Sequence, residues 1–300
     1  MTIAEIRSCI SEIENDQSLC EEKSFDDRVE VIDFMACWII GQIDELFQTG
    51  VQSAEMILLK DRAEKIKTEL ENVDNNLFQK LRAAIRAGKH IAKPFKTLVS
   101  EYVAFNLGDN EHQEEAGYDN LDMFTNGLFP RQAIPEQSKE LEPDMVFYQK
   151  TPARIVFELV EKMQFTKDDV FFDLGSGLGQ VAILVNLLTG IPTKGVEFEP
   201  AFCNCARDSA ADLNLSGVTF INADARRADY SEGTVFFMYT PFKGEMLQEV
   251  LDLLRKESLL RKIKIITYGP CTAQVALQSW LECAIFAGDN FYKLAIFSSF

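Results

Sequence analysis

Hydrophobic positions in the first third of the chain recur every three to four residues, which is the spacing of an amphipathic helix. This spacing predicts helices over residues 26–47, 53–72, 77–87 and 94–107. Pro94 suits the first turn of a helix, and Gly88 is a suitable helix end. Residues 1–107 are therefore predicted to form an all-helical N-terminal domain.

The pattern changes between Gly108 and Pro143, where acidic residues, Asn, Gly and three prolines interrupt the helical spacing. A long stretch without regular structure is usually a linker or a lid. Residues 108–150 are therefore predicted to be an acidic linker or lid. One interpretation is a solvated connector, and the other is that aromatic side chains from this region help to cover an active site: Tyr118, Phe124, Phe129 and Tyr148.

From Thr151 onward, short β-rich runs alternate with amphipathic helical ones, which is typical of parallel βαβ units. Strands are expected at 169–173, 193–198, 218–221, 235–239 and 262–268, and helices at 153–163, 181–188, 200–213 and 245–254. Ala287-Gly-Asp-Asn290 separates two apolar runs, 279–286 and 291–300, and predicts a hairpin. Residues 151–300 are predicted to form an open α/β sheet closed by a terminal antiparallel hairpin.

The composition is ordinary for a soluble globular protein, with 47% hydrophobic and 26% charged residues. No stretch approaches the roughly 18 consecutive apolar residues of a membrane span. The N-terminus lacks the basic start and apolar block of a secretory signal. Seven scattered cysteines, an odd number, argue against a disulfide framework and favour a reducing compartment. A cytoplasmic protein without membrane contact is expected.

The net charge of −17 is concentrated in the middle of the chain, because residues 101–150 contain 3 Lys or Arg against 11 Asp or Glu. Proteins usually hold phosphate backbones with Lys and Arg, so direct binding of nucleic acid is disfavoured. A protein substrate rich in Lys or Arg would complement this acidic segment. Neutralising four of its carboxylates would test that idea: Glu111, Glu114, Glu115 and Asp119.

The first predicted strand of the α/β domain leads into Asp173-Leu-Gly-Ser176-Gly-Leu-Gly-Gln180. Gly175, Gly177 and Gly179 permit a sharp turn and close approach of a ligand to the backbone, and the following helix directs its positive end at that ligand. Gln180 stands where a dinucleotide fingerprint needs Gly or Ala, which makes a nicotinamide-dependent enzyme the weaker hypothesis. The run instead matches the Asp/Glu-x-Gly-x-Gly-x-Gly pattern of S-adenosylmethionine (SAM) binding.

Three more acidic residues stand at or just after the ends of the next two predicted strands. Glu197 ends the second strand, about 20 residues beyond the glycine loop, and can accept hydrogen bonds from both ribose hydroxyls. Glu199 lies further into the turn and is expected to cap the helix that begins at Pro200. Asp224 follows the third strand, where it could accept a hydrogen bond from the adenine amino group. Asn or Asp at a strand end is also ordinary turn chemistry.

The fourth strand ends in Tyr239-Thr240-Pro241-Phe242, which are the candidate catalytic residues because the transferred methyl group should point there. Methyl transfer depends mainly on proximity and orientation. Aromatic faces of Tyr239 and Phe242 can exclude water and stabilise a cation, and Tyr148 and Thr151 could close the pocket from the other side. Residues 151–300 contain no His, so this domain supplies no His general base, and no metal site is expected.

Val146 to Phe198 resembles the non-SET histone lysine methyltransferases of the disruptor-of-telomeric-silencing type. The resemblance is carried by Tyr148 and Thr151, by Asp168 to Gln180, and by Gly195-Val-Glu197. It implies a Rossmann-like class I methyltransferase sheet. It also implies SAM contacts from Asp173, Gly175, Gln180 and Glu197, with Thr151 at the methionine end. The fourth-strand motif departs from that family, which carries Asn residues before an aromatic, and the family's basic nucleosome-binding segment has no counterpart.

The sequence therefore predicts a SAM-dependent methyltransferase acting on an unidentified acceptor, with a protein lysine or another amine as the leading candidate. Two alternatives stay open. One is a small-molecule N- or O-methyltransferase. The other is a SAM-binding scaffold without catalysis that acts through its helical domain, which the absence of Asn or Asp beside Pro241 favours. The oligomeric state is not defined by the sequence.

Overall fold

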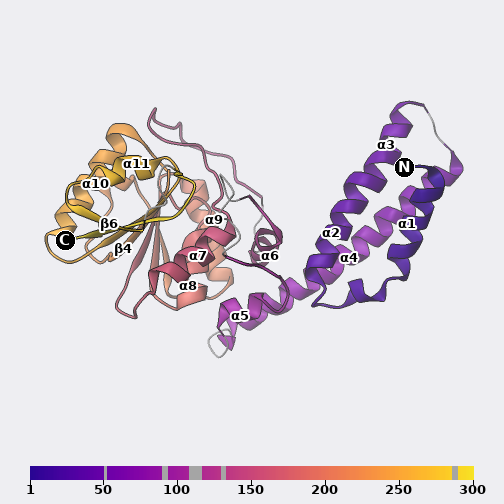
Figure 1. The fold of residues 1–300 in the computed structure, drawn as a ribbon, viewed down its shortest axis with the longest axis horizontal. Helices are drawn as coiled ribbons and strands as arrows, with labels where there is room; N and C mark the ends of the chain where they lie inside the picture. The colour runs from indigo at the N-terminus through magenta and orange to yellow at the C-terminus, as the bar shows by residue number, and fades with distance from the viewer. Residues whose placement is uncertain (51–52, 90–93, 108–116, 130–132, 286–289) are drawn as a thin grey trace. The chain divides into compact units, whose positions relative to one another are not determined.

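The computed structural model describes residues 1–300 except 51–52, 90–93, 108–116, 130–132 and 286–289 (Figure 1). The chain divides into two compact units. Unit 1 comprises Met1–Ala84 and Thr97–Phe105, and unit 2 comprises Ile85–Lys96 and Asn106–Phe300. None of the helices in the described ranges has the length and apolar character needed to cross a membrane.

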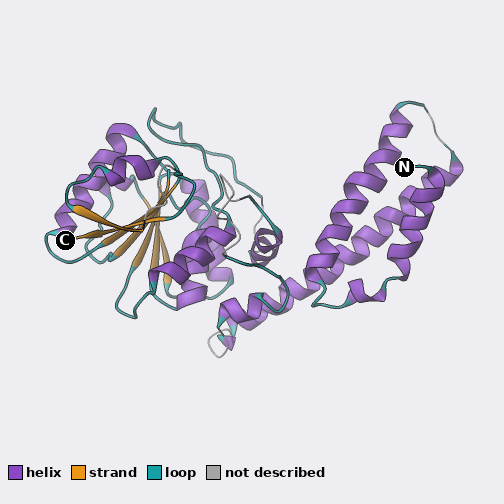
Figure 2. Ribbon diagram, viewed as in Figure 1, coloured by secondary structure: helices purple, strands orange, loops and turns teal. Residues whose placement is uncertain are grey.

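Unit 1 is built from helices (Figure 2). They are α1 (Ile3–Asn15), the short 3-10 helix η1 (Gln17–Cys20), α2 (Phe25–Phe34), the π-helical stretch η2 (Met35–Ile40), α3 (Gly41–Gln48), most of α4 (Ala54–Arg86) and part of α5 (Phe95–Val99). The segments α2, η2 and α3 follow one another without a break and occupy the helix predicted at 26–47. Two separate helices were predicted at 53–72 and 77–87, and the structure has one helix of 33 residues instead.

The joining of these two predicted helices has a physical reason at Asp74. Val73-Asp-Asn-Asn76 is a run of weak helix formers, but Asp74 Oδ1 accepts a hydrogen bond from Arg28 Nε at 2.7 Å. Arg28 is fully buried, and its Nη1 also donates to the carbonyls of Leu19 and Glu21. Tertiary bonding therefore overrides local propensity and keeps α4 continuous.

Helix α5 is shorter than predicted, since it ends at Val99 instead of continuing to about Leu107. Beyond it, the N–H of Ala104 donates to Asp26 Oδ2 at 2.7 Å instead of to a carbonyl four residues earlier. An acidic side chain from α2 thus takes over a bond that a longer helix would have made internally.

Unit 2 contains a seven-stranded sheet in the order β3-β2-β1-β4-β5-β7-β6. The strands are β1 (Phe171–Leu174), β2 (Thr193–Glu197), β3 (Val218–Asn222), β4 (Val235–Tyr239), β5 (Lys264–Tyr268), β6 (Leu281–Ile285) and β7 (Ala295–Ser299). Neighbours from β3 to β5 are parallel, whereas β7 is antiparallel to both β5 and β6. This confirms the predicted Rossmann-like sheet with terminal antiparallel strands. Of the predicted turn, residues 287–289 lie outside the described residues.

Helices cover both faces of the sheet (Figure 1). One face carries α7 (Ala153–Met163), α8 (Gln180–Thr189) and α9 (Pro200–Asp212), and the other carries α10 (Gly244–Ser258) and α11 (Cys271–Ala276). The side chains of β1 and β4 are almost wholly buried between these layers, as the two-sided covering requires. The strand order reverses beside β1, so the carboxyl ends of β1 and β4 define the crevice where ligands bind in such sheets.

The segment predicted to lack regular structure contains a helix, α6 (Asn120–Leu128). Asp119 caps it, and Asp122 at the third helical position accepts from the Asp119 N–H at 3.1 Å. This reciprocal pair is a capping box, whose acidic residues the sequence interpretation assigned to a linker. Phe124 is fully buried in α6, so it is a packing residue and not part of a cover. Helices α1 and α11 were not predicted either.

Candidate functional site

A pocket of about 220 Å³ opens at the carboxyl ends of the parallel strands. We call it the main pocket. Its wall includes Gly175 after β1, Glu197 and Phe198 at the end of β2, Asp224 after β3, and Tyr239–Phe242 after β4. The predicted residues therefore meet where the strand order places a ligand site.

We call residues 173–180 the glycine loop. At two of its glycines, other residues lie so close to the backbone that no side chain would fit. A Cβ at Gly175 (φ +77°) would lie 2.2 Å from Pro241 Cβ, and one at Gly177 (φ +52°) would lie 2.3 Å from the ring of Tyr148. Both positions also have the left-handed backbone that favours glycine. The loop is thus closed on one side by β4 and on the other by Tyr148, and Gly179 caps α8 beneath it.

Asp173, the residue before the last of β1, lines a smaller cavity that adjoins the main pocket. We call this space the acidic cavity. Among the described residues, Asp173 Oδ2, Ser176 Oγ and Gln180 Oε1 are buried without a hydrogen-bond partner. Burial raises the pKa of Asp173 to about 8, and the nearby Glu197 adds to the effect. Buried polar atoms without partners are costly and mark places where a ligand can supply the missing bonds. Tyr148 and Thr151 complete this cavity.

Glu197 is held rigidly at the end of β2. Its Oε2 accepts from the Gly177 N–H at 2.7 Å, and its Oε1 accepts from the Glu199 N–H at 2.8 Å. Burial raises the pKa of Glu197, although these backbone donors oppose the shift. Each carboxylate oxygen has a second lone pair, so Glu197 can also accept from two ligand hydroxyls.

Glu199 has a different task. It caps α9 by accepting from the Ala201 N–H at 3.0 Å, which confirms the predicted cap. It also accepts three hydrogen bonds of 2.8–2.9 Å from Ser138 and Lys139. Burial raises the pKa of Glu199, but these bonds outweigh it and hold the pKa below its ordinary value. Glu199 therefore anchors the segment around Ser138 and Lys139, and it does not compete with Glu197 for a ligand.

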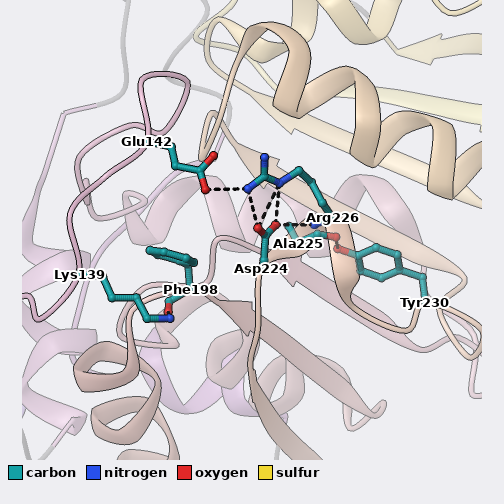
Figure 3. Close-up of polar contacts among 7 residues, drawn as sticks. All are labelled: Lys139, Glu142, Phe198, Asp224, Ala225, Arg226 and Tyr230. Carbon is teal, nitrogen blue, oxygen red and sulfur yellow. Dashed lines mark hydrogen bonds and ion pairs between the residues drawn. The ribbon is translucent and has the colours of Figure 1, made fainter.

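Asp224 lies in the main pocket but is already paired (Figure 3). Its Oδ1 accepts from the N–H and Nε of Arg226 at 2.8 and 3.0 Å, and its Oδ2 accepts from Nε and Nη2 at 3.1 and 2.6 Å. Hydrogen bonds from Arg226 lower the pKa of Asp224. The adenine contact expected of Asp224 stays a prediction, and Arg226 is a competitor for it that the sequence interpretation missed.

Residues 137–149, which we call the strap, cross the strand ends and line the main pocket. Ser138 and Lys139 bind Glu199, and the Lys139 Nζ lies 4.1 Å from the centre of the Phe198 ring. Further along, Glu142 accepts from Arg226 Nη2 at 2.8 Å (Figure 3). The Val146 N–H donates to the Pro241 carbonyl at 3.1 Å. The strap is thus attached to the loops after β2, β3 and β4.

Of the four aromatic residues proposed as a cover, Tyr148 lies in the main pocket. Tyr118 is 58% exposed and donates its hydroxyl to the Lys150 carbonyl at 2.6 Å. Asp119, one of the four acidic residues proposed for docking a basic substrate, forms an ion pair with Arg154 at 2.6 Å. Glu111, Glu114 and Glu115 lie outside the described residues.

The loop after β4 forms the far wall of the main pocket. Thr240 has φ +38°, and its hydroxyl donates to the Tyr268 carbonyl at 3.3 Å and accepts from the Cys271 N–H at 3.2 Å. Thr240 therefore holds the loop against β5. Phe242 is almost fully buried, whereas Tyr239 lines the pocket with its ring centre 4.9 Å from that of Tyr268. The lining also includes residues that were not predicted as site residues, among them Met246, Pro270 and Tyr292.

No group of three His, Cys, Asp or Glu that could hold a metal ion occurs in the described part of the chain. Of the predicted site residues, the main pocket takes Tyr148, Gly175, Glu197, Asp224 and the four from 239 to 242. The acidic cavity takes Thr151, Asp173, Ser176 and Gln180. Tyr148, Gly175 and Tyr239 line both spaces, whereas Gly177 and Gly179 line neither.

Residues 142–266 match the family model described as histone methylation protein DOT1. This match confirms the resemblance predicted from the glycine loop and its flanks, and it covers less than half of the chain and none of unit 1. No curated protein matches the chain.

Solved structures of methyltransferases are similar to this chain over about half its length. An RNA methyltransferase from Salinibacter ruber in complex with S-adenosyl-L-homocysteine is 22% identical, covering 50% of this chain and 92% of that one, with a TM-score of 0.41. Precorrin-6y C5,15-methyltransferase from Geobacter metallireducens is 18% identical, covering 52% and 92%, with a TM-score of 0.38. A SAM-dependent methyltransferase from Thiobacillus denitrificans, also with S-adenosyl-L-homocysteine, is 23% identical, covering 39% and 48%, with a TM-score of 0.34.

Proposed function

We propose that this protein is a SAM-dependent methyltransferase that transfers a methyl group to an amine. The observation that carries the proposal is the joining of the main pocket to a cavity with unpartnered polar atoms of Asp173, Ser176 and Gln180. The match of residues 142–266 to a histone methylation family supports it.

The residues present fit SAM. Glu197 would bind the ribose hydroxyls, because both of its oxygens are fixed by backbone donors and keep a lone pair each. Asp173 and Gln180 would bind the amino-acid end, since their buried oxygens lack partners among the described residues. Phe198 and Asp224 line the side left for the adenine. When bound, the sulfonium supplies an electrophilic methyl group.

The chain's own contribution is to position the acceptor and to exclude water. Tyr239, Met246 and Tyr292 line the main pocket beyond the glycine loop. Aromatic faces there would stabilise an ammonium acceptor and its methylated product. Phe147 also lines the pocket, is 79% exposed and would contact an approaching acceptor. Transfer would then depend on proximity and orientation.

A basic protein is the acceptor that the charge distribution favours. Residues 101–150 contain 11 acidic against 3 basic residues, and complementary charge speeds and orients protein association. Within the strap, Glu140 is an exposed carboxylate suited to a test of this idea, whereas Glu142 is paired with Arg226. None of the seven cysteines forms a disulfide bond, and a reducing compartment such as the cytoplasm stays the proposed location.

The test is a single-turnover assay with SAM labelled in its methyl group, using purified histones, a lysine-rich peptide and cell extract as acceptors. The proposal expects label in a protein or peptide and much less label with the Glu197→Ala variant. Label confined to small molecules would identify a small-molecule methyltransferase instead. Saturable SAM binding with no label in any fraction would favour the scaffold alternative.

A further inference from the structure

A third cavity, of about 170 Å³, adjoins the acidic cavity. We call it the basic cavity because Lys150 lines it. Tyr148 and Gln180 line both of these cavities, so the two spaces share a wall. Asn126 of α6 lines the basic cavity from the other side. None of the residues that the sequence interpretation assigned to the methionine end carries a positive charge, so Lys150 is a new element of this region.

Lys150 is held in place by the side-chain amide of Asn126. Its Nζ donates to Asn126 Oδ1, and the same oxygen accepts from Gln180 Nε2 at 3.5 Å. An ammonium group has three donors, and the bond to Asn126 uses one. Burial lowers the pKa of Lys150, while the negative charge of Asp122 opposes the shift. A partly buried ammonium in this position would be stabilised by a ligand anion.

Gln180 lines both the acidic cavity, which contains the Asp173 carboxyl group, and the basic cavity, which contains the Lys150 ammonium group. Gln180 is 6% exposed, and its Oε1 has no hydrogen-bond partner among the described residues. A ligand end that carries both an ammonium and a carboxylate would suit both groups, because its ammonium would favour the ionised form of Asp173 and its carboxylate would pair with Lys150.

We propose that Lys150, positioned by Asn126, pairs with the α-carboxylate of the bound cofactor, while Asp173 pairs with its α-ammonium. This inference rests on the proposed function, since it takes SAM as the ligand. Lys150 is then a cofactor-binding residue that selects ligands with a complete amino-acid end. It also fixes which way that end points, because exchanging the two groups would place like charges together.

The test measures binding by calorimetry with three ligands: SAM, decarboxylated SAM and 5′-methylthioadenosine, which lacks the amino-acid end. We expect Lys150→Met to weaken SAM binding by about 10- to 150-fold, the range for a hydrogen bond to a charged group. The same variant should bind the other two ligands as the unmodified protein does. The matched control is Lys167→Met, because Lys167 is an exposed lysine of the same unit.

Two results would overturn the inference while leaving the proposed function intact. One is an equal loss of affinity for all three ligands in Lys150→Met, and the other is equal binding of SAM and decarboxylated SAM by the unmodified protein. The second comparison needs no variant, so it decides the matter even if Lys150→Met fails to fold. Failure of the unmodified protein to bind any of the three ligands would instead refute the proposed function.

Discussion

Replacing Asp173 by Asn should change how the stability of unit 2 depends on pH. Burial raises the pKa of Asp173 to about 8, whereas an exposed Asp in the unfolded chain has a pKa of about 3.9. Between these values the folded state holds a proton that the unfolded state has released. The free energy of unfolding therefore falls as the pH rises, by up to about 1.4 kcal/mol per pH unit.

Between pH 5.5 and 7.5 the ionisation of Asp173 therefore lowers the free energy of unfolding by roughly 2 to 3 kcal/mol for a pKa of about 8. Asn has no proton to lose, so Asp173→Asn should lack this share of the pH dependence. The stability of the variant relative to the unmodified protein should thus increase with pH across that window. The sign is the reverse of that for a salt-bridged Asp, whose contribution is lost on acidification.

The assay is urea unfolding followed by tryptophan fluorescence at three pH values. The chain has two Trp residues, and Trp280 packs against the core of unit 2. Trp38 belongs to unit 1 and is 58% exposed, so a Trp38→Phe background leaves a reporter of unit 2 alone. Parallel pH profiles for the Asp173→Asn variant and its parent would refute the reasoning, because they would mean that Asp173 is ionised in the folded state.

Three further predictions concern single side chains. Glu197→Ala should weaken SAM binding by about 1.5–3 kcal/mol in calorimetry, the range for bonds to a charged group, and an unchanged affinity would remove Glu197 from the ribose site. Gly177→Ala should displace the Tyr148 ring, which a Cβ would meet at 2.3 Å, and weaken SAM binding while circular dichroism stays unchanged; full affinity would show that the loop adapts. Arg28→Met should destabilise unit 1 by about 3–5 kcal/mol, because it leaves Asp74 buried without its partner. Urea unfolding followed by the fluorescence of Trp38, the tryptophan of unit 1, measures this loss. An unchanged midpoint would contradict the prediction.

The sheet could be predicted because its strands carry local signals. The strand predicted at 235–239 has those bounds in the structure, and β3 and β5 differ from the prediction by one or two residues at their ends. Each is a short apolar run followed by a turn or a polar residue, which suffices for a strand buried on both faces. Helix α6 was missed because its few turns stand among Gly, Asn and Pro, where only the capping box signals a start.

The cofactor residues could be located because glycine spacing and acidic strand ends are local motifs. Their partners could not, because those partners come from distant parts of the chain. Glu142 and Arg226 are 84 residues apart, and Asn126 and Gln180 are 54 apart. Only the folded chain brings the strap across the strand ends, so the pairing of Asp224 and the placing of Lys150 follow from tertiary structure.

The central claim is that the glycine loop and its polar neighbours form a SAM site. Titration of SAM into the purified protein, with NAD as the comparison ligand, tests it most directly. The account predicts saturable binding of one SAM per chain, no binding of NAD, and weaker SAM binding when Glu197 is replaced by Ala. Saturable NAD binding without SAM binding, or binding of neither ligand, would contradict it.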